Sequence, residues 1–211
     1  MIYIHKGKEP GAWTHKRLTP NAVYEATSDL RESLLKEQGY ICAYCMRRIP
    51  AKDGKIDATS KIEHVLSQER HNDLQMDYGN MVVCCPGKIN DGELHCDSSK
   101  GEKDLLCSPL SIQAMGTIQY NPSDGRIKSS DPKYDKEIND ALNLNTQILM
   151  DNRSETWNAV CDYLTSRGWT LSNVRKELTR YQSKNTEGKR IPYCGIVIYF
   201  LTKKLRLLET Q

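Results

Sequence analysis

Residues 37–49 read EQGYICAYCMRRI, and the two cysteines at the centre of this stretch decide the fold. Cys42 and Cys45 are separated by two residues, a spacing that lets both thiolates reach one tetrahedral metal ion. One such pair needs a second pair elsewhere in the chain. We expect Cys85 and Cys96 to supply it and to complete a four-sulfur site for a structural Zn²⁺ ion.

The second half of this site has alternatives. Two adjacent cysteines rarely both bind one ion, so Cys84 is expected to pack inward beside Cys85. A different interpretation makes both of them small core residues of a strand. Another replaces Cys96 with His95. The remaining cysteines are isolated in the sequence and are expected in the core: Cys107, Cys161 and Cys194.

Length and composition narrow the class of protein. The chain has 211 residues, enough for one core with a helical extension. Its longest apolar candidate, residues 191–201, falls short of the roughly 20 residues that a membrane helix needs. The first residues lack the apolar core of a signal peptide. We therefore expect a cytoplasmic protein with no membrane contact, whose cysteines bind metal or pack rather than form disulfides.

The charges are unevenly distributed along the chain. Residues 170–211 contain nine basic and three acidic residues, whereas residues 61–169 contain 11 basic and 17 acidic residues. A basic tail beside an acidic middle suggests a polyanion near the end of the chain and a cation in the middle. The alternative is that both segments are simply solvated faces.

Short elements surround the cysteine pairs. A helix is expected from Asp29, as its cap, to Gly39, which would end it in the left-handed conformation. Residues 61–66 and 80–85 read as short strands, and residues 97–106 as a short helix. Residues 5–26 read as irregular.

The second half of the chain reads as a hairpin followed by helices. Residues 117–120 and 126–129 flank a turn that contains proline and glycine. Helical spacing of apolar residues dominates from residue 133, with Ser154 and Ser172 as expected caps. The chain is therefore predicted to be α+β, with a small metal-bearing module followed by a mostly helical C-terminal half.

Polar and ionisable residues lie between the two cysteine pairs and directly after the second pair. Glu63 and His64 lie near the end of one predicted strand, Asn80 begins the next one, and Asp97 and Lys100 follow Cys96. Neighbouring residues on a strand point to opposite faces, so Glu63 and His64 can share a site only where the strand ends or bulges. A neutral imidazole can accept a proton at cellular pH, and a carboxylate pair attracts a divalent cation.

In their order, these residues resemble the zinc-bearing HNH endonucleases. The resemblance is closest to the PtuB subgroup, the nuclease subunits of Septu anti-phage systems, including those encoded beside retrons. It covers about residues 6–153. The segments that carry it are Lys8-Glu-Pro, residues 37–49, Lys61-Ile-Glu-His, Asp77-Tyr-Gly-Asn-Met, His95-Cys-Asp-Ser-Ser-Lys-Gly, Gly125-Arg-Ile, Leu142-Asn-Leu-Asn and Asn152-Arg.

The resemblance implies roles for individual residues. His64 matches the general base that activates water, and Asn80 matches the residue that orients it. Glu63 and Asp97 would bind a catalytic Mg²⁺ or Mn²⁺ ion; Asp97 stands where the family more often has histidine, which favours a hard ion. The family core is a ββα-metal fold of the His-Me finger type, and the offset of Cys85 from Asn80 matches the zinc ligand.

Nucleic-acid contacts and partners complete the prediction. Lys100 is expected to clamp a phosphate, and Arg47 and Arg48 to contact the nucleic-acid backbone, although exposed solvated arginines are an equal alternative. The resemblance also implies a PtuA-like ATPase partner and, beside a retron, a reverse transcriptase with its msDNA. A zinc-ribbon module that binds nucleic acid or protein without cutting is the competing hypothesis.

The predicted organisation has three parts. Residues 1–28 form an irregular lead-in, residues 29–110 a zinc-bearing nuclease core, and residues 111–211 a hairpin with helices for partner docking or nucleic-acid contact. The substrate, DNA or RNA including tRNA, stays open because the core reads backbone phosphates that both share.

Overall fold

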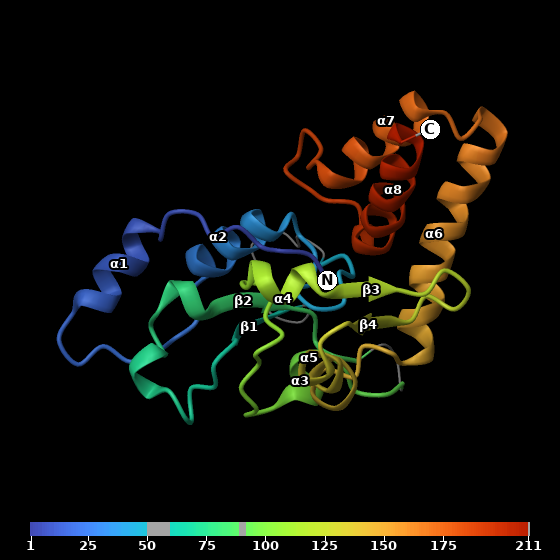
Figure 1. The fold of residues 1–211 in the computed structure, drawn as a ribbon. Coiled ribbons are helices and arrows are strands. Elements are labelled where there is room, and N and C mark those ends of the chain that lie inside the picture. Colours follow the sequence, from blue (N-terminus) through green and yellow to red (C-terminus); the bar gives the residue numbers. More distant parts are fainter. Residues whose placement is uncertain (50–59, 89–91, 211) are drawn as a thin grey trace.

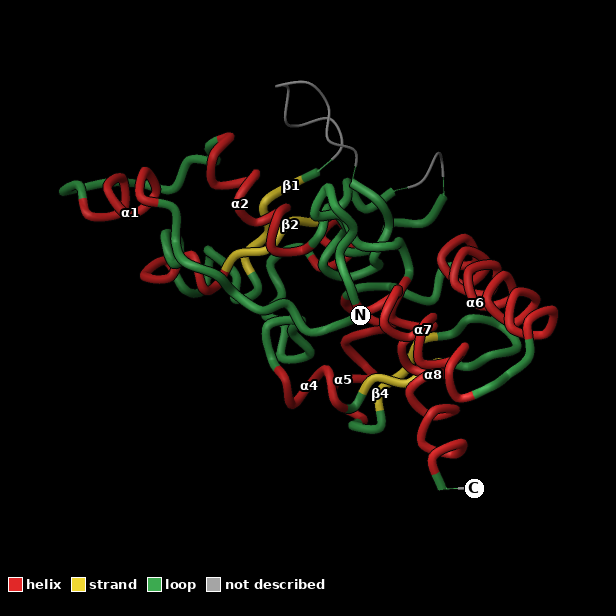
Figure 2. The backbone as a smooth tube through the Cα atoms, turned by 90° about the horizontal axis from the view of Figure 1, so that it is seen from above, coloured by secondary structure: helices red, strands yellow, loops and turns green. Residues whose placement is uncertain are grey.

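A computed structural model of the chain describes residues 1–49, 60–88 and 92–210. Two small two-stranded sheets lie among helices, and the C-terminal half is mostly helical, so the predicted α+β class is confirmed. The helices Gly11–Leu18 and Gln147–Arg167 lie at opposite ends of the molecule (Figures 1 and 2). The main elements are α1 (Gly11–Leu18), α2 (Ser28–Gln38), β1 (Lys61–His64), β2 (Met81–Cys84), α3 (Asp97–Lys100), α4 (Ile112–Gly116), β3 (Ile118–Tyr120), β4 (Ile127–Ser129), α5 (Pro132–Lys136), α6 (Gln147–Arg167), α7 (Leu171–Gln182) and α8 (Cys194–Glu209).

The N-terminal segment contains a helix that the sequence did not predict. α1 follows Pro10, and the Trp13 side chain on it is 2% exposed. The indole Nε1 of Trp13 donates a hydrogen bond to the carbonyl of Met76 at 3.1 Å. The predicted irregular structure over residues 5–26 is therefore wrong for α1, because one buried aromatic residue anchors this helix in place of an apolar stripe.

α2 leads directly into the first cysteine pair. Its cap is Thr27, whose side chain accepts a hydrogen bond from a backbone N–H three residues later at 3.3 Å. Asp29 lies inside the first turn, so the predicted cap there is wrong. Gly39 ends the helix with a φ of +68°, as predicted. Gln38 exchanges two side-chain hydrogen bonds with the backbone of Val83 on β2, at 2.8 and 2.7 Å.

β1 and β2 form an antiparallel pair, and α3 follows them in the chain. Glu63 and His64 are the last two residues of β1, which ends there and not at residue 66 as predicted. α3 is a single turn and stops at Lys100 instead of reaching residue 106. The strand end at His64 removes the strict alternation that would keep two neighbouring side chains on opposite faces.

The predicted hairpin forms as β3 and β4. Gly125 in its turn has a φ of +68°, and a side chain there would collide with the carbonyl of Met150 on α6. The Gly125 carbonyl accepts a hydrogen bond from Nε of Arg153 at 2.5 Å. Arg153 is 3% exposed, and its guanidinium therefore fastens α6 to the hairpin.

The long helices begin earlier than the sequence suggested. α6 begins directly after Thr146. α7 begins directly after Thr170, whose side chain caps it. Ser154 and Ser172, the predicted caps, lie inside these helices. α7 and α8 pack together, and α6 packs against α8. In the part of the chain that the structure describes, no helix is both long and apolar enough to cross a membrane.

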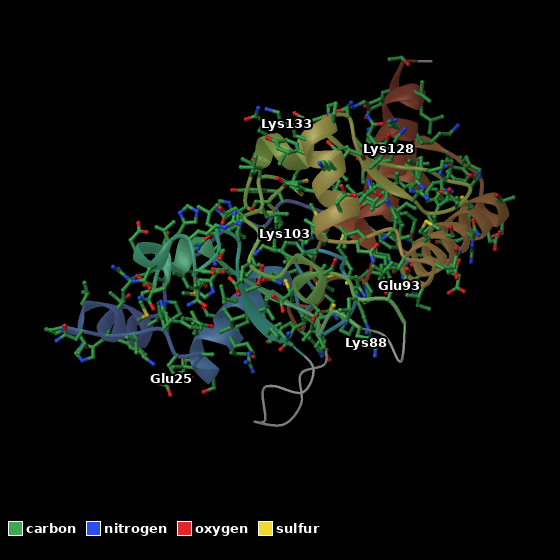
Figure 3. All side chains as sticks on the ribbon, turned by 90° about the horizontal axis from the view of Figure 1, so that it is seen from below. Glu25, Lys88, Glu93, Lys103, Lys128 and Lys133 are labelled. Atoms are coloured by element: carbon green, nitrogen blue, oxygen red, sulfur yellow. The ribbon has the colours of Figure 1, made fainter. Side chains whose placement is uncertain are left out.

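One buried apolar core runs from the N-terminal segment through the cysteine pairs to the last helix. Charged side chains such as Lys103, Lys128 and Lys133 lie on the outside (Figure 3). The division of the chain after residues 28 and 110 remains a prediction.

Candidate metal centre and adjoining pocket

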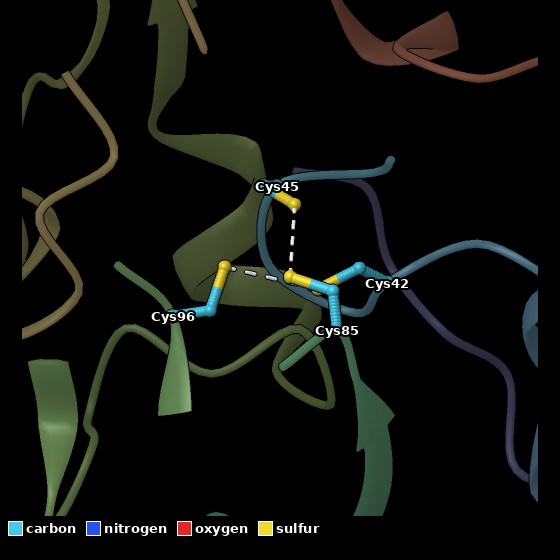
Figure 4. Close-up of side chains that lie close together, drawn as sticks. All are labelled: Cys42, Cys45, Cys85 and Cys96. Atoms are coloured by element: carbon cyan, nitrogen blue, oxygen red, sulfur yellow. Dashed lines mark hydrogen bonds between the residues drawn. The ribbon is translucent and has the colours of Figure 1, made fainter. Parts of the chain in front are cut away.

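Four buried cysteines from three separate segments converge on one point. The Sγ atoms of Cys42, Cys45, Cys85 and Cys96 all lie within 4.8 Å of one another (Figure 4). The Cys42–Cys96 and Cys45–Cys85 Sγ distances are 3.8 and 3.7 Å. Sulfurs placed about 2.3 Å from a tetrahedral zinc ion are separated by about 3.8 Å. The cluster therefore has the size of a structural zinc site, as predicted.

The backbone of the first cysteine pair folds into a tight knuckle. The N–H of Cys42 donates to the carbonyl of Arg47 at 2.9 Å, and the N–H of Met46 donates to the carbonyl of Cys42 at 3.1 Å. Met46 adopts a positive φ of 65° to close this turn. The Ala43 N–H donates to Val83 on β2 at 3.0 Å, which places the knuckle beside the end of that strand.

The two alternative ligands lie outside the four-sulfur group. Cys84 is fully buried at the end of β2 and is not part of the cluster. His95 is also buried, and its Nε2 lies 3.8 Å from Sγ of Cys85. An imidazole at that position can hydrogen-bond a ligand sulfur and steady its charge. Cys107 and Cys194 are buried as predicted, and Cys161 is half-buried.

A second feature adjoins the cysteine cluster through the chain itself. Asp97 directly follows Cys96 and begins α3, so the position of Cys96 in the cluster fixes where this carboxylate lies. Asp97, Glu63, His64 and Lys100 line one pocket of about 620 Å³ between β1 and α3. We call it the β1–α3 pocket. His64 and Asp97 are 33 positions apart in the sequence and were both predicted site residues, and they line the same cavity.

The two carboxyl groups in this pocket interact directly. Glu63 is 5% exposed, and burial together with a hydrogen bond to Asp97 raises the pKa of Glu63 to about 8. Burial alone would raise the pKa of Asp97, but its hydrogen bonds with Glu63 and Lys61 bring it below the usual value. The Lys61 Nζ lies 3.0 Å from Oδ2 of Asp97. Without a metal, the pair therefore holds one proton, mainly on Glu63.

Lys100 is a buried residue of the β1–α3 pocket. It is 2% exposed, and its Nζ lies 2.7 Å from Oε1 of Glu63 and donates to the carbonyl of His64 at 3.0 Å. Tyr44 of the knuckle also donates to Oε1 of Glu63, at 3.3 Å. An ammonium held in this way fixes Glu63 and the end of β1. The ammonium of Lys100 is buried and hydrogen-bonded inside the fold, which gives no support to its predicted phosphate contact, and that contact stays a prediction.

The surroundings of His64 favour the neutral form of its imidazole. Its Nε2 lies 3.0 Å from the carbonyl oxygen of Gln75, an acceptor, so Nε2 carries the proton and Nδ1 keeps the lone pair. The ring of Tyr24 meets the imidazole edge-on at a centroid distance of 4.6 Å. Burial lowers the pKa of His64 below its usual value, which keeps the ring neutral near pH 7.

Gln75 and Tyr24 are site residues that the sequence analysis missed. Neither could be found from the sequence, because a backbone carbonyl in a polar loop and a single aromatic residue before α2 belong to no motif.

Within residues 1–49, 60–88 and 92–210, the four cysteines are the one group of three or more His, Cys, Asp or Glu side chains gathered closely enough to bind a metal. His64 therefore shares the β1–α3 pocket with the carboxyl pair but does not join it as a ligand.

Asn80 holds the loop behind His64. Its Oδ1 accepts from the Leu66 N–H at 2.8 Å, and its Nδ2 donates to the Leu66 carbonyl at 2.9 Å. The backbone carbonyl of Asn80 also accepts from Val65 at 2.9 Å. The side chain thus continues the pairing of β1 and β2 past the end of β1. These bonds agree with an orienting role for Asn80. The side chain can position the loop behind His64 without touching the imidazole.

Replacing Asn80 with alanine is expected to lower the free energy of unfolding by about 1–3 kcal/mol, because the N–H and the carbonyl of half-buried Leu66 both lose their partner. Asn72→Ala is the matched control: Asn72 is exposed and accepts one surface hydrogen bond, from Gln75. We expect it to cost less than about 0.5 kcal/mol. Urea unfolding followed by circular dichroism measures both. Equal, small losses would mean that Asn80 does not secure the loop.

The two arginines after the knuckle have different surroundings. NH1 of Arg48 donates to the carbonyls of Gly39 and Tyr40 at 3.1 and 3.0 Å, and NH2 donates to the carbonyl of Arg190. Arg48 thereby caps α2 and connects the knuckle to the segment before α8. The guanidinium of Arg48 is hydrogen-bonded inside the fold, which gives no support to its predicted nucleic-acid contact, and that contact stays a prediction. Arg47 is half-buried, and its predicted contact remains untested.

Comparison with known proteins adds no relative. No protein-family model matches the chain. A search of curated proteins likewise finds no match. The fold and the site therefore define the class: an α+β protein with a buried four-cysteine cluster suited to a structural zinc ion.

Proposed function

We propose that the chain is a metal-dependent endonuclease of the HNH type, which hydrolyses phosphodiester bonds in nucleic acid. The observation that carries the proposal is the β1–α3 pocket, which is lined by His64, whose Nδ1 carries no proton, and by the coupled carboxyl groups of Glu63 and Asp97. The chain order of β1, β2 and α3, with His64 ending β1, supports a ββα-metal core. The likeness of the sequence motifs to the PtuB subgroup points the same way.

The carboxyl pair fits a divalent cation. Two hard oxygen donors that share a proton in a partly buried pocket are stabilised when a cation replaces that proton. Lys100 holds one oxygen of Glu63 and Lys61 holds one oxygen of Asp97, which leaves the second oxygen of each for a metal. Mg²⁺ or Mn²⁺ bound there would neutralise charge on the scissile phosphate and the leaving oxygen.

The chain's own residues supply the general base, stabilise it and position the carboxyl groups. Nδ1 of His64 accepts the proton of the water that attacks phosphorus, and the bond to the leaving oxygen breaks. The resulting imidazolium is stabilised by the Gln75 carbonyl, which already accepts the Nε2 hydrogen at 3.0 Å. Lys100 acts as a positioning residue, because one ammonium holds both Glu63 and the His64 backbone. The zinc site serves as a scaffold that places Asp97 beside Glu63.

The cellular context is part of the proposal. By the likeness of its motifs, the chain acts in the cytoplasm as the nuclease subunit of an ATPase-gated anti-phage complex with a PtuA-like ATPase. In a retron-linked system, a reverse transcriptase and its msDNA would join the complex. Sequencing of the nucleic acids cut in activated cells would identify DNA or RNA as the substrate.

Cleavage is expected to require Mg²⁺ or Mn²⁺, and replacing Asp97 with asparagine should raise the Mg²⁺ concentration for half-maximal cleavage at least about tenfold. The chain is purified with its neighbouring ATPase and incubated with plasmid, single-stranded DNA and tRNA over a range of Mg²⁺. Asp162→Asn is the control, because Asp162 is exposed on α6 and does not line the β1–α3 pocket. Absence of divalent-dependent cleavage of every substrate would overturn the proposal.

A second function is favoured by the cysteine cluster alone. A zinc-ribbon module that binds nucleic acid or the ATPase without cutting needs only the four buried thiolates. It does not need the Glu63–Asp97 pair or the oriented imidazole. The same cleavage assay separates the two, since a pure binding module retains zinc and binding but cuts nothing.

A further inference from the structure

A second pocket lies in the C-terminal helical bundle. Its volume is about 470 Å³, within the range of small-ligand sites. Six residues line it: Trp157, Trp169, Phe200, Lys203, Lys204 and Leu207. They come from α6, the α6–α7 connection and α8. Within the described part of the chain, no residue lines both this tryptophan pocket and the β1–α3 pocket, so the two are separate.

Three aromatic rings form its walls. The rings of Trp157 and Phe200 are 4.8 Å apart at 36°, and those of Trp157 and Trp169 are 6.4 Å apart at 61°. All three side chains are half-buried, so each ring is fixed by packing and still has an accessible part. Leu207 at the lip is 60% exposed. Rigid, partly exposed rings offer a stacking surface at little cost in conformational entropy.

The charges around the rings are of one sign. The Lys204 Nζ lies 5.9 Å from the Trp169 ring centroid, and Lys203 lies beside Tyr199, with its Nζ 4.3 Å from that ring. No carboxylate lines the tryptophan pocket among the residues that the structure describes. The surrounding segment, residues 170–211, has nine basic and three acidic residues. The ligand that complements this site is flat, apolar on its faces and negatively charged at its edge.

We propose that the tryptophan pocket binds an unpaired base of single-stranded nucleic acid, with the lysines on the adjoining phosphates. Aromatic stacking combined with lysine contacts is how proteins hold single strands without reading their sequence. A base within a duplex is already stacked on its neighbours, so the site selects single strands. The inference rests on the proposed function in taking nucleic acid as the ligand, and adds a substrate-holding site away from the cleavage pocket.

Tryptophan fluorescence reports this site directly. The chain has three tryptophans, and Trp13 is 2% exposed on α1, so a stacked base quenches Trp157 and Trp169. The probes are fluorescein-labelled oligothymidylate and oligouridylate, mixed with the full chain without added Mg²⁺. We expect both to quench and a duplex of equal length not to quench. Anisotropy of the same probes gives the dissociation constant.

Variants separate stacking from simple charge attraction. Trp169→Ala is expected to raise the dissociation constant roughly 5- to 100-fold. Leu207→Glu, at an exposed position that leaves the core intact, should raise it at least about fivefold by placing a negative charge beside the phosphates. Lys204→Ala should reduce the slope of log K against log salt by about 0.7. Tyr163→Ala and Lys133→Ala, at exposed positions outside the pocket, are the controls.

The outcomes distinguish this inference from the proposed nuclease. No quenching of the wild-type chain, or an unchanged dissociation constant in both Trp169→Ala and Leu207→Glu, would overturn it, even if the chain cuts nucleic acid. Quenching without any cleavage would leave it standing while the nuclease proposal fails. Release of the ATPase by Leu207→Glu, with oligonucleotide binding unaltered, would mark the pocket as a protein-docking site and also overturn it.

Discussion

Replacing Cys85 with serine is expected to remove the zinc ion and to lower the free energy of unfolding by about 5 kcal/mol or more. Structural zinc contributes about 10–16 kcal/mol of apparent folding energy in small peptides. A core that continues into the C-terminal helices should retain part of the fold here. The loss is therefore expected to be large and to fall mainly on the segments that carry the four cysteines.

The adjacent residue provides the matched control. Cys84 is as buried as Cys85 but lies outside the four-sulfur group, so Cys84→Ala should cost only about 1–2 kcal/mol and keep one zinc per chain. Elemental analysis after dialysis gives the metal content, and urea unfolding gives the stability. The assignment of ligands would be wrong if Cys84→Ala lost zinc while Cys85→Ser kept it.

The four-cysteine cluster was predictable because the geometry of a metal site constrains the spacing of its ligands along the chain. Two residues between Cys42 and Cys45 allow both thiolates to face one ion, and this rule holds without knowledge of the rest of the fold. The choice of Cys85 over Cys84 was also correct for the cluster. That one ion accommodates adjacent cysteines poorly excludes only binding by both, and the choice of Cys85 rested on the resemblance, through its offset from Asn80.

Helix caps were less predictable, for a physical reason. Thr27 and Asp29 are both good capping residues and lie two positions apart, as do Thr170 and Ser172. A local rule cannot choose between them, because packing decides where the helix first turns toward the core. The missed helix α1 has a similar cause, since its burial rests on Trp13 alone.

The partners of charged side chains were the least predictable feature, because they are set by the tertiary structure. Lys100 and Arg48 read as phosphate contacts in the sequence, yet each is held by partners from distant segments. Lys100 is 36 residues from His64, whose carbonyl it contacts, and Arg48 is 142 residues from Arg190. The position of Glu63 and His64 was predicted conditionally, on the strand ending there, and β1 does end at His64.

Replacing His64 with alanine is expected to lower the rate of nucleic-acid cleavage by about 10²–10⁴-fold, the usual contribution of a general base. The reason lies in the tautomer: Gln75 holds the proton on Nε2, and Nδ1 is left to accept the proton of the attacking water. Because burial lowers the pKa of His64, wild-type activity should persist at pH values below the usual imidazole value and fall only when the ring becomes protonated. His71→Ala is the control, since His71 is bound to Asp104 at 3.1 Å and lies outside the β1–α3 pocket.

The His64 variant must be separated from a folding defect, because the imidazole is 6% exposed and packs against Tyr24. Zinc content and circular dichroism should match the wild type, since none of the four cysteines is changed. Added imidazole should restore part of the activity by filling the space that the side chain leaves, which a merely structural role does not allow. Full activity of His64→Ala in the presence of the ATPase would show that another group activates the water, and the β1–α3 pocket would then lose its role as the catalytic centre.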